Sequence, residues 1–344
     1  MRIPLHTSGG TVGIAPLALV DLFTEEGVTG HAYVFCYTPP ALRPTVQMVG
    51  NLASLLKGDP LAPQEIDRKL QRHFRLLGAK GIAGMALAGI DMAAWDALAK
   101  AAGLPLVRLL GGAPRKIPAY NSCGLGIIGA EKAAAEAQQL AEGFPAIKVR
   151  LGYADAKADL DVVRAVRKAV GPGIHLMSDY NQSLTVAEAM VRCEALADEG
   201  LAWVEEPTSQ DDYEGHARIR AKARVPIQMG ENWWGPHEMA KCVAAGGSDL
   251  CMPDAMKIGG VTGWLRAAAI AEAAGLPVSS HLFPEVSAHL LAVSPTSHWL
   301  EYVDWANPIL QEPLRIEGGQ AVIPDAPGTG IAWNEENVSR HLAA

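Results

Sequence analysis

The chain has 344 residues, of which 49% are hydrophobic and 19% charged, with a formal net charge of -8. That length is enough for one large α/β domain or two smaller ones around a buried core. No run of about 18 uninterrupted apolar residues occurs, so we predict no membrane span, and an acidic balance without a basic patch argues against binding to nucleic acid. The N-terminus lacks a signal-peptide core, and the five scattered cysteines favour reduced thiols, so we predict a cytoplasmic protein.

The first hundred residues predict a small α+β unit. Residues 15–37 have the pattern of a hairpin, because two β-rich runs flank the segment EEGV, which supplies a turn glycine. Helical patterns follow at about residues 41–56, 63–76 and 83–102. After GGAPRK the pattern changes.

From about residue 117 onward, short apolar runs alternate with amphipathic segments. The runs are IPAYNS, AIKVR, IHLMSDY, LAWVEE, PIQMGE, DLCMPD, PVSSH and HWLE, and the helical segments include 156–170, 184–198, 236–245 and 261–274. Eight strands joined by helical crossovers predict a closed parallel (β/α)8-type barrel. An open doubly wound sheet is the alternative, but the glycine-rich phosphate loop that usually follows its first strand is missing from the sequence.

Three carboxylates occupy the ends of successive predicted strands. Asp179, Glu205 and Glu231 follow one another at intervals of 26 residues, about one β/α unit. A barrel gathers the carboxyl ends of its strands around one mouth, where these groups would repel one another without a cation. Oxygen ligands favour a hard divalent ion such as Mg²⁺. The alternative is that each carboxylate caps the helix after its strand. Glu206 should point away from this cluster, because adjacent strand residues face opposite sides.

The remaining strand ends carry groups suited to acid–base chemistry. Asp254 and His281 lie on neighbouring strands, where a hydrogen bond would fix the imidazole tautomer. Glu301 would be a proton donor if burial kept it neutral, or would otherwise pair with a cation. Lys148 and Arg150 lie two residues apart in AIKVR, so both face the same side of their strand.

At this point the sequence resembles a known family. The segments SDYNQSL, VEEPT, MGEN, MPDAMKIGGVTGW, SSHL and HWLE are similar to the mandelate racemase branch of the enolase superfamily, and the similarity extends over essentially the whole chain. It implies an α/β fold with an N-terminal α+β capping domain (1–112), a modified TIM barrel of the (β/α)7β type (113–315) and a C-terminal segment (316–344) that returns to the cap. By the same comparison, the chain begins inside the first cap strand of the family.

The resemblance also implies an activity. Such enzymes bind Mg²⁺ and remove the proton α to a carboxylate, giving an enediolate that the metal stabilises. The implied residues are the metal ligands Asp179, Glu205 and Glu231, the base His281 with Asp254, Glu301 and Lys148 near the substrate carboxylate, Asn181 at the α-hydroxyl, Ser122 in the substrate site, and Lys257 as an orienting group. A carbon acid beside a carboxylate resists deprotonation, so a metal, a cation and a proton donor make chemical sense together.

An apolar pocket is the predicted specificity surface. The resemblance places Val12 on a loop (6–13) that closes over the substrate, although Gly9 stands where the branch has a branched apolar residue. The other lining candidates are Phe35, Tyr37, Leu76, Leu282 and Val303. Such a pocket favours an aryl or alkyl α-hydroxy acid over a sugar acid. Ordinary core packing is the alternative for each of them.

Arg150 departs from the pattern of the branch. Racemases of this kind carry Lys-x-Lys, whose second lysine is the base for the other enantiomer, whereas here the segment is Lys148-Val149-Arg150. Arginine holds its proton and is a poor general base. Three hypotheses remain: a racemase or epimerase in which Arg150 is an unusual base or leaves activity weak, a one-base dehydratase in which His281 transfers the protons and Arg150 only binds, and a non-catalytic Mg²⁺-dependent carboxylate-binding protein. The resemblance further implies a symmetric homo-oligomer, such as an octamer.

Overall fold

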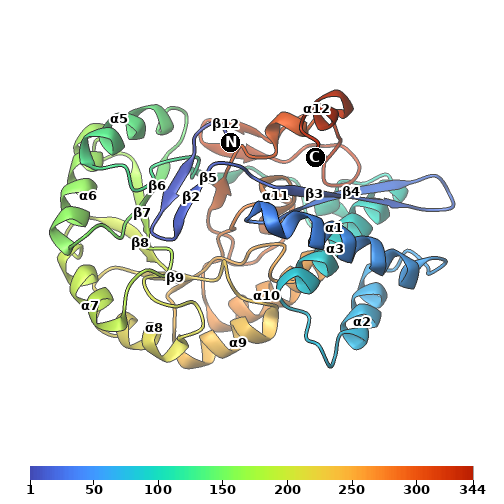
Figure 1. Cartoon of the computed structure of the whole chain (residues 1–344), viewed down its shortest axis with the longest axis horizontal. Helices are drawn as coiled ribbons and strands as arrows, with labels where there is room; N and C mark the ends of the chain where they lie inside the picture. The colour runs from blue at the N-terminus through green and yellow to red at the C-terminus, as the bar shows by residue number, and fades with distance from the viewer. Residues whose placement is uncertain (344) are drawn as a thin grey trace.

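The cap begins with two antiparallel hairpins and continues into helices (Figure 1). Its elements are β1 (Leu5–Thr7), β2 (Gly10–Val12), β3 (Leu17–Phe23), β4 (Thr29–Phe35), α1 (Pro39–Leu56), α2 (Pro63–His73), α3 (Gly81–Ala101) and the short α4 (Leu106–Leu109). This structure, a computed structural model, describes residues 1–343. The predicted hairpin and three helices are confirmed within a few residues. The segment predicted as a loop at 6–13 instead forms most of the β1–β2 hairpin.

The barrel follows the cap in the chain and forms the left part of Figure 1. Its strands are β5 (Ile117–Asn121), β6 (Ala146–Arg150), β7 (His175–Asp179), β8 (Leu201–Glu205), β9 (Ile227–Met229), β10 (Leu250–Cys251) and β11 (Leu300–Tyr302). Strands β5 to β10 pair in order and in parallel, and β11 pairs with β5. The helices are α5 (Ala130–Leu140), α6 (Ala156–Val170), α7 (Val186–Ala195), α8 (Tyr213–Arg220), α9 (Pro236–Ala245), α10 (Gly260–Ala274) and α11 (Pro284–Ala292).

The strand predicted at PVSSH is not regular. Val278 bridges Cys251 on one side and Ser297 on the other, and His281 bridges Asp254, so the segment closes the barrel through isolated contacts only. Pro277 lacks the N–H that a ladder needs, and the left-handed backbone of Leu282 (φ 49°) ends the extended run. The fold is the (β/α)7β variant of the TIM barrel, whose last strand returns to the first.

The C-terminal segment joins the barrel to the cap. After the 3-10 helix η1 (Asn307–Ile309), β12 (Arg315–Glu317) and β13 (Gln320–Val322) form a hairpin, and β13 pairs antiparallel with β5. Farther on, Thr329 donates its backbone N–H to Asp96 of α3 at 2.6 Å, and the indole of Trp333 donates to Asp21 of β3 at 2.7 Å. The helix α12 (Glu335–Arg340) then ends near the cap strands (Figure 1).

Helix α3 is the core helix of the cap. Within residues 1–343 it alone is long and apolar enough to cross a membrane by length and composition, but 89% of that window is buried in the protein. Glycine permits its close packing on β4, because a Cβ at Gly30 would lie 2.0 Å from the carbonyl oxygen of Ala93. The helix is therefore the surface on which the β3–β4 hairpin packs.

Asp91 connects this helix to the barrel. Its carboxylate, 4% exposed, accepts hydrogen bonds from the backbone N–H of Thr262 at 3.0 Å and from the Thr262 hydroxyl, which also accepts from the indole of Trp95 at 2.9 Å. A Cβ at Gly260 would collide with Asp91, at 2.3 Å from its Oδ2. The contact thus fixes the start of α10 against the cap.

Asp91 gives the protein a pH-dependent stability. Burial raises the pKa of Asp91 to about 7, although the bonds from Thr262 oppose this. Between about pH 4 and about pH 7 the unfolded chain has released this proton while the native state holds it, so the free energy of unfolding decreases as pH rises and levels off above that window. Urea titrations across this range should show a loss of a few kcal/mol at most in the wild type, and Asp91→Asn should reduce it. An equal pH dependence in both proteins would contradict this account, with Asp198→Asn on the exposed surface as control.

Candidate active site

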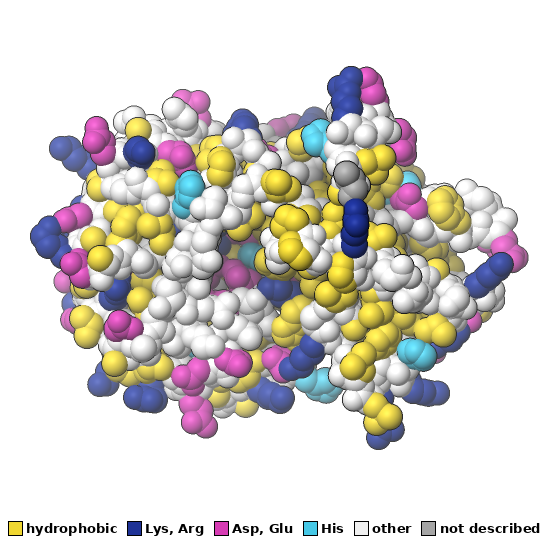
Figure 2. All heavy atoms as spheres, viewed as in Figure 1, with side chains coloured by type: hydrophobic (Ala, Val, Ile, Leu, Met, Phe, Trp, Pro, Cys, Tyr) yellow, Lys and Arg dark blue, Asp and Glu magenta, His cyan; other side chains and the backbone are white. Residues whose placement is uncertain are grey.

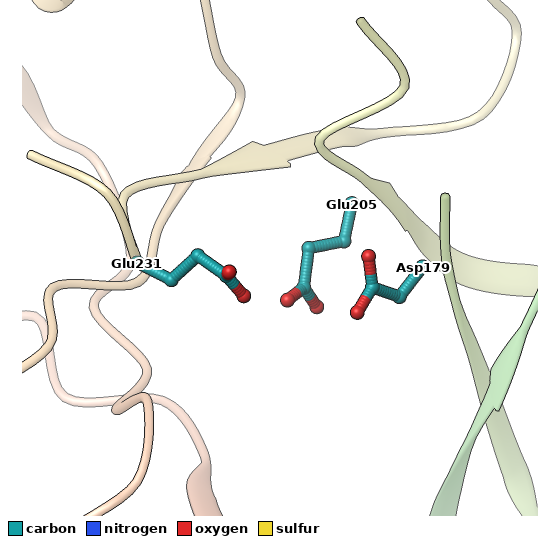
Figure 3. Close-up of side chains that lie close together, drawn as sticks. All are labelled: Asp179, Glu205 and Glu231. Carbon is teal, nitrogen blue, oxygen red and sulfur yellow. The ribbon is translucent and has the colours of Figure 1, made fainter. Parts of the chain in front are cut away.

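Three carboxylates meet at the carboxyl ends of the barrel strands. Asp179 ends β7, Glu205 ends β8 and Glu231 follows β9, and Figure 3 shows their side chains pointing toward one another. One oxygen from each lies within 4.8 Å of the others, and all three residues are buried. The parallel register explains the meeting, because Asp179 pairs directly with Glu205 across β7 and β8.

The electrostatics of this cluster fit a cation. Burial raises the pKa of Asp179, and raises the pKa of Glu205 well above its ordinary value, while Lys148 acts in the opposite direction. Burial would also raise the pKa of Glu231, but His281, Lys257 and Lys148 together lower it to about 2. Full ionisation of all three carboxylates therefore needs additional positive charge. A donor set made only of carboxylate oxygens suits a hard divalent ion that keeps positions for water or substrate.

Lys148 provides the fixed charge beside these acids. Its Nζ lies 2.9 Å from Oε1 and 3.1 Å from Oε2 of Glu205, 2.8 Å from Oε1 of Glu301 and 3.7 Å from Oδ2 of Asp179. Burial lowers the pKa of Lys148, but Glu205, Glu301 and Asp179 outweigh burial and raise the pKa. The ammonium group thus stays charged although the side chain is only 1% exposed.

Glu301 lies beside two basic side chains, with its Oε1 2.8 Å from Nζ of Lys148 and its Oε2 3.9 Å from Nε2 of His281. Burial alone would raise the pKa of Glu301, yet Lys148 and His281 lower it far below its usual range. Its Oε2 accepts a hydrogen bond from the backbone N–H of Leu282 at 2.9 Å, which also favours the charged form. The contact with Lys148 agrees with the alternative in which Glu301 pairs with a cation.

His281 and Asp254 form a hydrogen-bonded pair. Nδ1 of His281 lies 2.7 Å from Oδ2 of Asp254, whose Oδ1 accepts from the backbone N–H groups of Met256 and Lys257 at 2.8 and 2.9 Å. Nε2 faces the acidic cluster, 3.4 Å from Oε2 of Glu231. Burial lowers the pKa of His281, but Glu231, Glu301 and Asp254 raise it overall. Asp254 fixes the imidazole so that Nε2 is the nitrogen that faces the site.

Polar side chains around the cluster hold its ligands. Asn181 donates to both oxygens of Asp179, through N at 2.7 Å and Nδ2 at 2.8 Å, and its own Oδ1 is buried without a partner. Glu206 does not belong to the group of three carboxylates, but it lies beside it: Nδ2 of Asn232 donates to Glu206 at 2.7 Å and to Oε1 of Glu231 at 3.2 Å. Oδ1 of Asn232 in turn accepts from Nζ of Lys257 at 2.5 Å. The orienting role expected for Lys257 would act through this contact.

Two contributors were missed from the sequence. Asn232 directly follows Glu231 in the MGEN segment, and this position next to a predicted metal ligand could have identified it. Trp203 lies two residues before Glu205 on the same strand and therefore faces the same side, and its indole N–H donates to Oε2 of Glu205 at 3.2 Å. Such groups fix the orientation of metal ligands.

Arg150 is bound to the loop after β5. Its NH1 donates to the carbonyl oxygens of Gly124 at 2.9 Å and Ser122 at 3.3 Å, and its NH2 donates to the hydroxyl of Ser122 at 3.0 Å. Nε is buried without a hydrogen-bond partner and lies 3.9 Å from Oδ2 of Asp179. Both terminal nitrogens thus donate hydrogen bonds within the protein, and Ser122, expected in the substrate site, contacts this guanidinium.

Three aromatic side chains pack together, and one of them lies beside Lys257. The ring of Phe35 lies 4.5 Å from that of Tyr37 and 5.1 Å from that of Trp305, between centroids. Lys257 Nζ lies 4.3 Å above the Tyr37 ring, and the Tyr37 hydroxyl is buried without a partner. Leu282 is buried, and so is Val303.

The β1–β2 hairpin lies over the barrel mouth. The hydroxyl of Ser8 donates to the backbone carbonyl of Tyr180 at 3.1 Å, and the backbone carbonyl of His6 accepts from the N–H of Ile127 at 2.7 Å. Val12 is half-buried. Figure 2 shows acidic, basic and histidine side chains at the base of a hollow near the middle of this face. Leu76 is a correction: it follows the end of α2 and is fully exposed, so it lines no pocket in this structure.

Comparison with known proteins agrees with this architecture. The model of the mandelate racemase / muconate lactonizing enzyme N-terminal domain matches residues 1–111, and the enolase C-terminal domain-like model matches residues 132–337. The chain belongs to the mandelate racemase branch of the enolase superfamily.

Relatives within the superfamily differ in reaction. A solved enolase from Bradyrhizobium, complexed with magnesium and mandelic acid, is 46% identical with a TM-score of 0.96, over 100% of this chain and 95% of that one. The D-galactarolactone cycloisomerase of Agrobacterium fabrum is 31% identical, over 92% of this chain and 89% of the relative. The L-talarate/galactarate dehydratase of Salmonella typhimurium is 33% identical, over 82% and 72%. The chain is therefore a Mg²⁺-dependent enzyme of this superfamily, as predicted.

Magnesium should stabilise the protein through the acidic cluster. Titration with Mg²⁺ should raise the melting temperature of the wild type, since a ligand present at about a hundredfold over its Kd contributes about 2.7 kcal/mol. Asp179→Asn removes one of the repelling charges, so it should lose the Mg²⁺-dependent rise while melting no lower than the wild type in EDTA. Asp198→Asn, on the exposed surface, should behave like the wild type. A full Mg²⁺ response in Asp179→Asn would place the metal elsewhere.

Proposed function

We propose that this enzyme removes the α-proton of a small α-hydroxy carboxylate with His281 as its only base, and that its reaction is the dehydration of an acid carrying a second hydroxyl on the β-carbon. Asp179, Glu205 and Glu231 would hold the Mg²⁺. The bound ion supplies positive charge to the substrate carboxylate as that group gains a second negative charge.

The arrangement of Arg150 carries this proposal. A two-base racemase needs a proton acceptor on the substrate face opposite His281, where the branch places its second lysine. Arg150 occupies that sequence position, and its terminal nitrogens donate to Ser122 and Gly124. A guanidinium that keeps its proton and is held by carbonyl groups is suited to positioning the loop rather than accepting a proton.

The residues of the chain divide the reaction as follows. Asp254 accepts a hydrogen bond from Nδ1–H of His281, which leaves the unprotonated Nε2 to take the α-proton. The electrons of the C–H bond first move onto the substrate carboxylate, and they then return to form a double bond between the α- and β-carbons as the β-carbon–oxygen bond breaks. The leaving hydroxyl takes the proton from His281 and departs as water, and the enol product rearranges to a 2-keto acid. Lys148 offsets the negative charge that develops on the carboxylate.

Unpartnered polar atoms support a substrate with more than one hydroxyl. The Tyr37 hydroxyl, Asn181 Oδ1 and Arg150 Nε are buried without partners among the described residues, and each belongs to a side chain at the site. Buried polar groups are normally satisfied, so a ligand that hydrogen-bonds to them stabilises the complex. Several relatives are sugar-acid dehydratases, among them the Salmonella enzyme.

Racemisation of an aryl α-hydroxy acid is the second candidate. The aromatic wall of Phe35, Tyr37 and Trp305 favours it, because stacked rings suit an aryl substituent better than a polyhydroxylated chain. The mandelic acid bound to the Bradyrhizobium relative also supports this substrate class. In this reading Arg150 would have to act as a base on the second face.

Isotope exchange separates these functions. The Mg²⁺-loaded enzyme is incubated in D₂O with each enantiomer of mandelate and with a panel of aldonic and aldaric acids, and α-deuteration, optical rotation and 2-keto acid are followed. We expect keto acid from a dihydroxy acid, and label without inversion in one mandelate enantiomer. His281→Asn should reduce the rates by about a hundredfold or more. Label and inversion of both enantiomers would establish the racemase, and equal inactivity of wild type and His281→Asn would favour a binding protein.

Substitution of Arg150 tests its role directly. Arg150→Lys introduces a group that can lose its proton on the opposite face, so inversion of mandelate should appear or increase. Arg150→Gln keeps a donor for the loop but supplies no base, and should show no inversion. Polarimetry of both variants decides the matter, because a lack of inversion in Arg150→Lys would contradict the assignment of the second face to this position.

A further inference from the structure

A buried acid that takes no part in the reaction described above lies four residues after His281. Glu285, in the first turn of α11, is 3% exposed; its Oε2 accepts a hydrogen bond from the hydroxyl of Tyr33 at 2.7 Å, and its Oε1 has no partner among the described residues. Tyr33 belongs to β4 of the cap and is also buried. The pair is therefore a polar contact between cap and barrel inside the protein.

The backbone between His281 and α11 is held in an unfavourable conformation. Leu282 and Phe283 have φ of 49° and 48°, so two consecutive residues with side chains adopt the left-handed region. Such backbone persists only where surrounding contacts hold it. The ring of Phe283 packs against that of Tyr33, with centroids 5.0 Å apart and planes 27° from parallel. From the barrel side, the hydroxyl of Ser287 donates to the carbonyl of Leu282 at 2.9 Å.

This turn sets two contacts of the active site. Its first residue, Leu282, directs a backbone N–H at Oε2 of Glu301 at 2.9 Å. The preceding residue is His281, whose ring lies 2.7 Å from Asp254. A change in the turn would move both the His281 imidazole and the Leu282 N–H that donates to Glu301, because the two residues are consecutive.

We propose that Tyr33 is a positioning residue: through its ring on Phe283 and its hydroxyl on Glu285, the cap holds the left-handed turn that orients His281. The inference rests on the proposed function of His281 as the base. It assigns the cap a part in the proton transfer, in addition to covering the substrate.

The phenol oxygen distinguishes this role from packing. Phenylalanine at position 33 would fill the same volume and keep the ring against Phe283. A purely structural Tyr33 would therefore lose only stability when its hydroxyl is removed, whereas a positioning Tyr33 releases Glu285 and with it the start of α11.

The test compares Tyr33→Phe with Tyr213→Phe in the Mg²⁺-loaded full chain. Tyr213 is the matched control, because its hydroxyl makes the same kind of bond, 3.0 Å to Glu238, on α8 and α9. In ¹⁵N-histidine-labelled protein the Nδ1 signal of His281 should shift in Tyr33→Phe and stay in place in Tyr213→Phe. The signal of His289, buried elsewhere on α11, should be unchanged in both. An unchanged His281 signal in Tyr33→Phe would overturn the proposal.

Mandelate exchange in D₂O gives the functional readout. Tyr33→Phe should lower kcat about tenfold with KM within about twofold of the wild type, as loss of base alignment predicts. Wild-type kcat in a variant that merely melts earlier would contradict the proposal. If Tyr33→Phe fails to fold, Tyr33→Phe/Glu285→Gln removes the unpaired buried charge and gives the same readouts. Failure of the proposed function is distinct, since wild type and His281→Asn would then exchange alike while the His281 signal still reports the turn.

Discussion

The ammonium group of Lys148 holds together an arrangement of acids that would otherwise be unstable. It is buried and lies within hydrogen-bond distance of Glu205 and Glu301. One such charge offsets part of the repulsion, and the remaining negative charge creates the need for a divalent cation.

The fold tolerates this concentration of charge because the residues that stabilise it lie apart from the acidic cluster. Parallel strands deliver the acids to one mouth, while apolar packing elsewhere, in α3 and in the barrel interior, supplies the stabilising energy. Cap, barrel and C-terminal segment interlock through buried polar contacts such as those of Asp91 and Asp96. The cap therefore has a fixed position over the mouth, from which its aromatic side chains and Tyr33 reach the catalytic segment.

Much of this site could be predicted from the sequence, because strand ends repeat at a regular interval and each carries one polar group. The metal cluster and the pair His281 and Asp254 follow from that pattern. The contact between Glu301 and Lys148 could not be predicted, because Lys148 lies on β6, more than a hundred residues earlier in the chain. The partners of Arg150 lie on a loop whose course no local pattern specifies. The exposure of Leu76 likewise depends on where α2 ends, and helix boundaries are poorly determined by sequence.

The central claim is that one histidine serves one face of the substrate while Arg150 holds a loop on the other. A crystal structure of the enzyme with Mg²⁺ and an α-hydroxy acid tests it most directly. The account predicts that the hydrogen of the α-carbon faces Nε2 of His281 and that Arg150 keeps its bonds to Ser122 and Gly124. A structure in which Arg150 has left that loop and faces the α-carbon from the opposite side would contradict it.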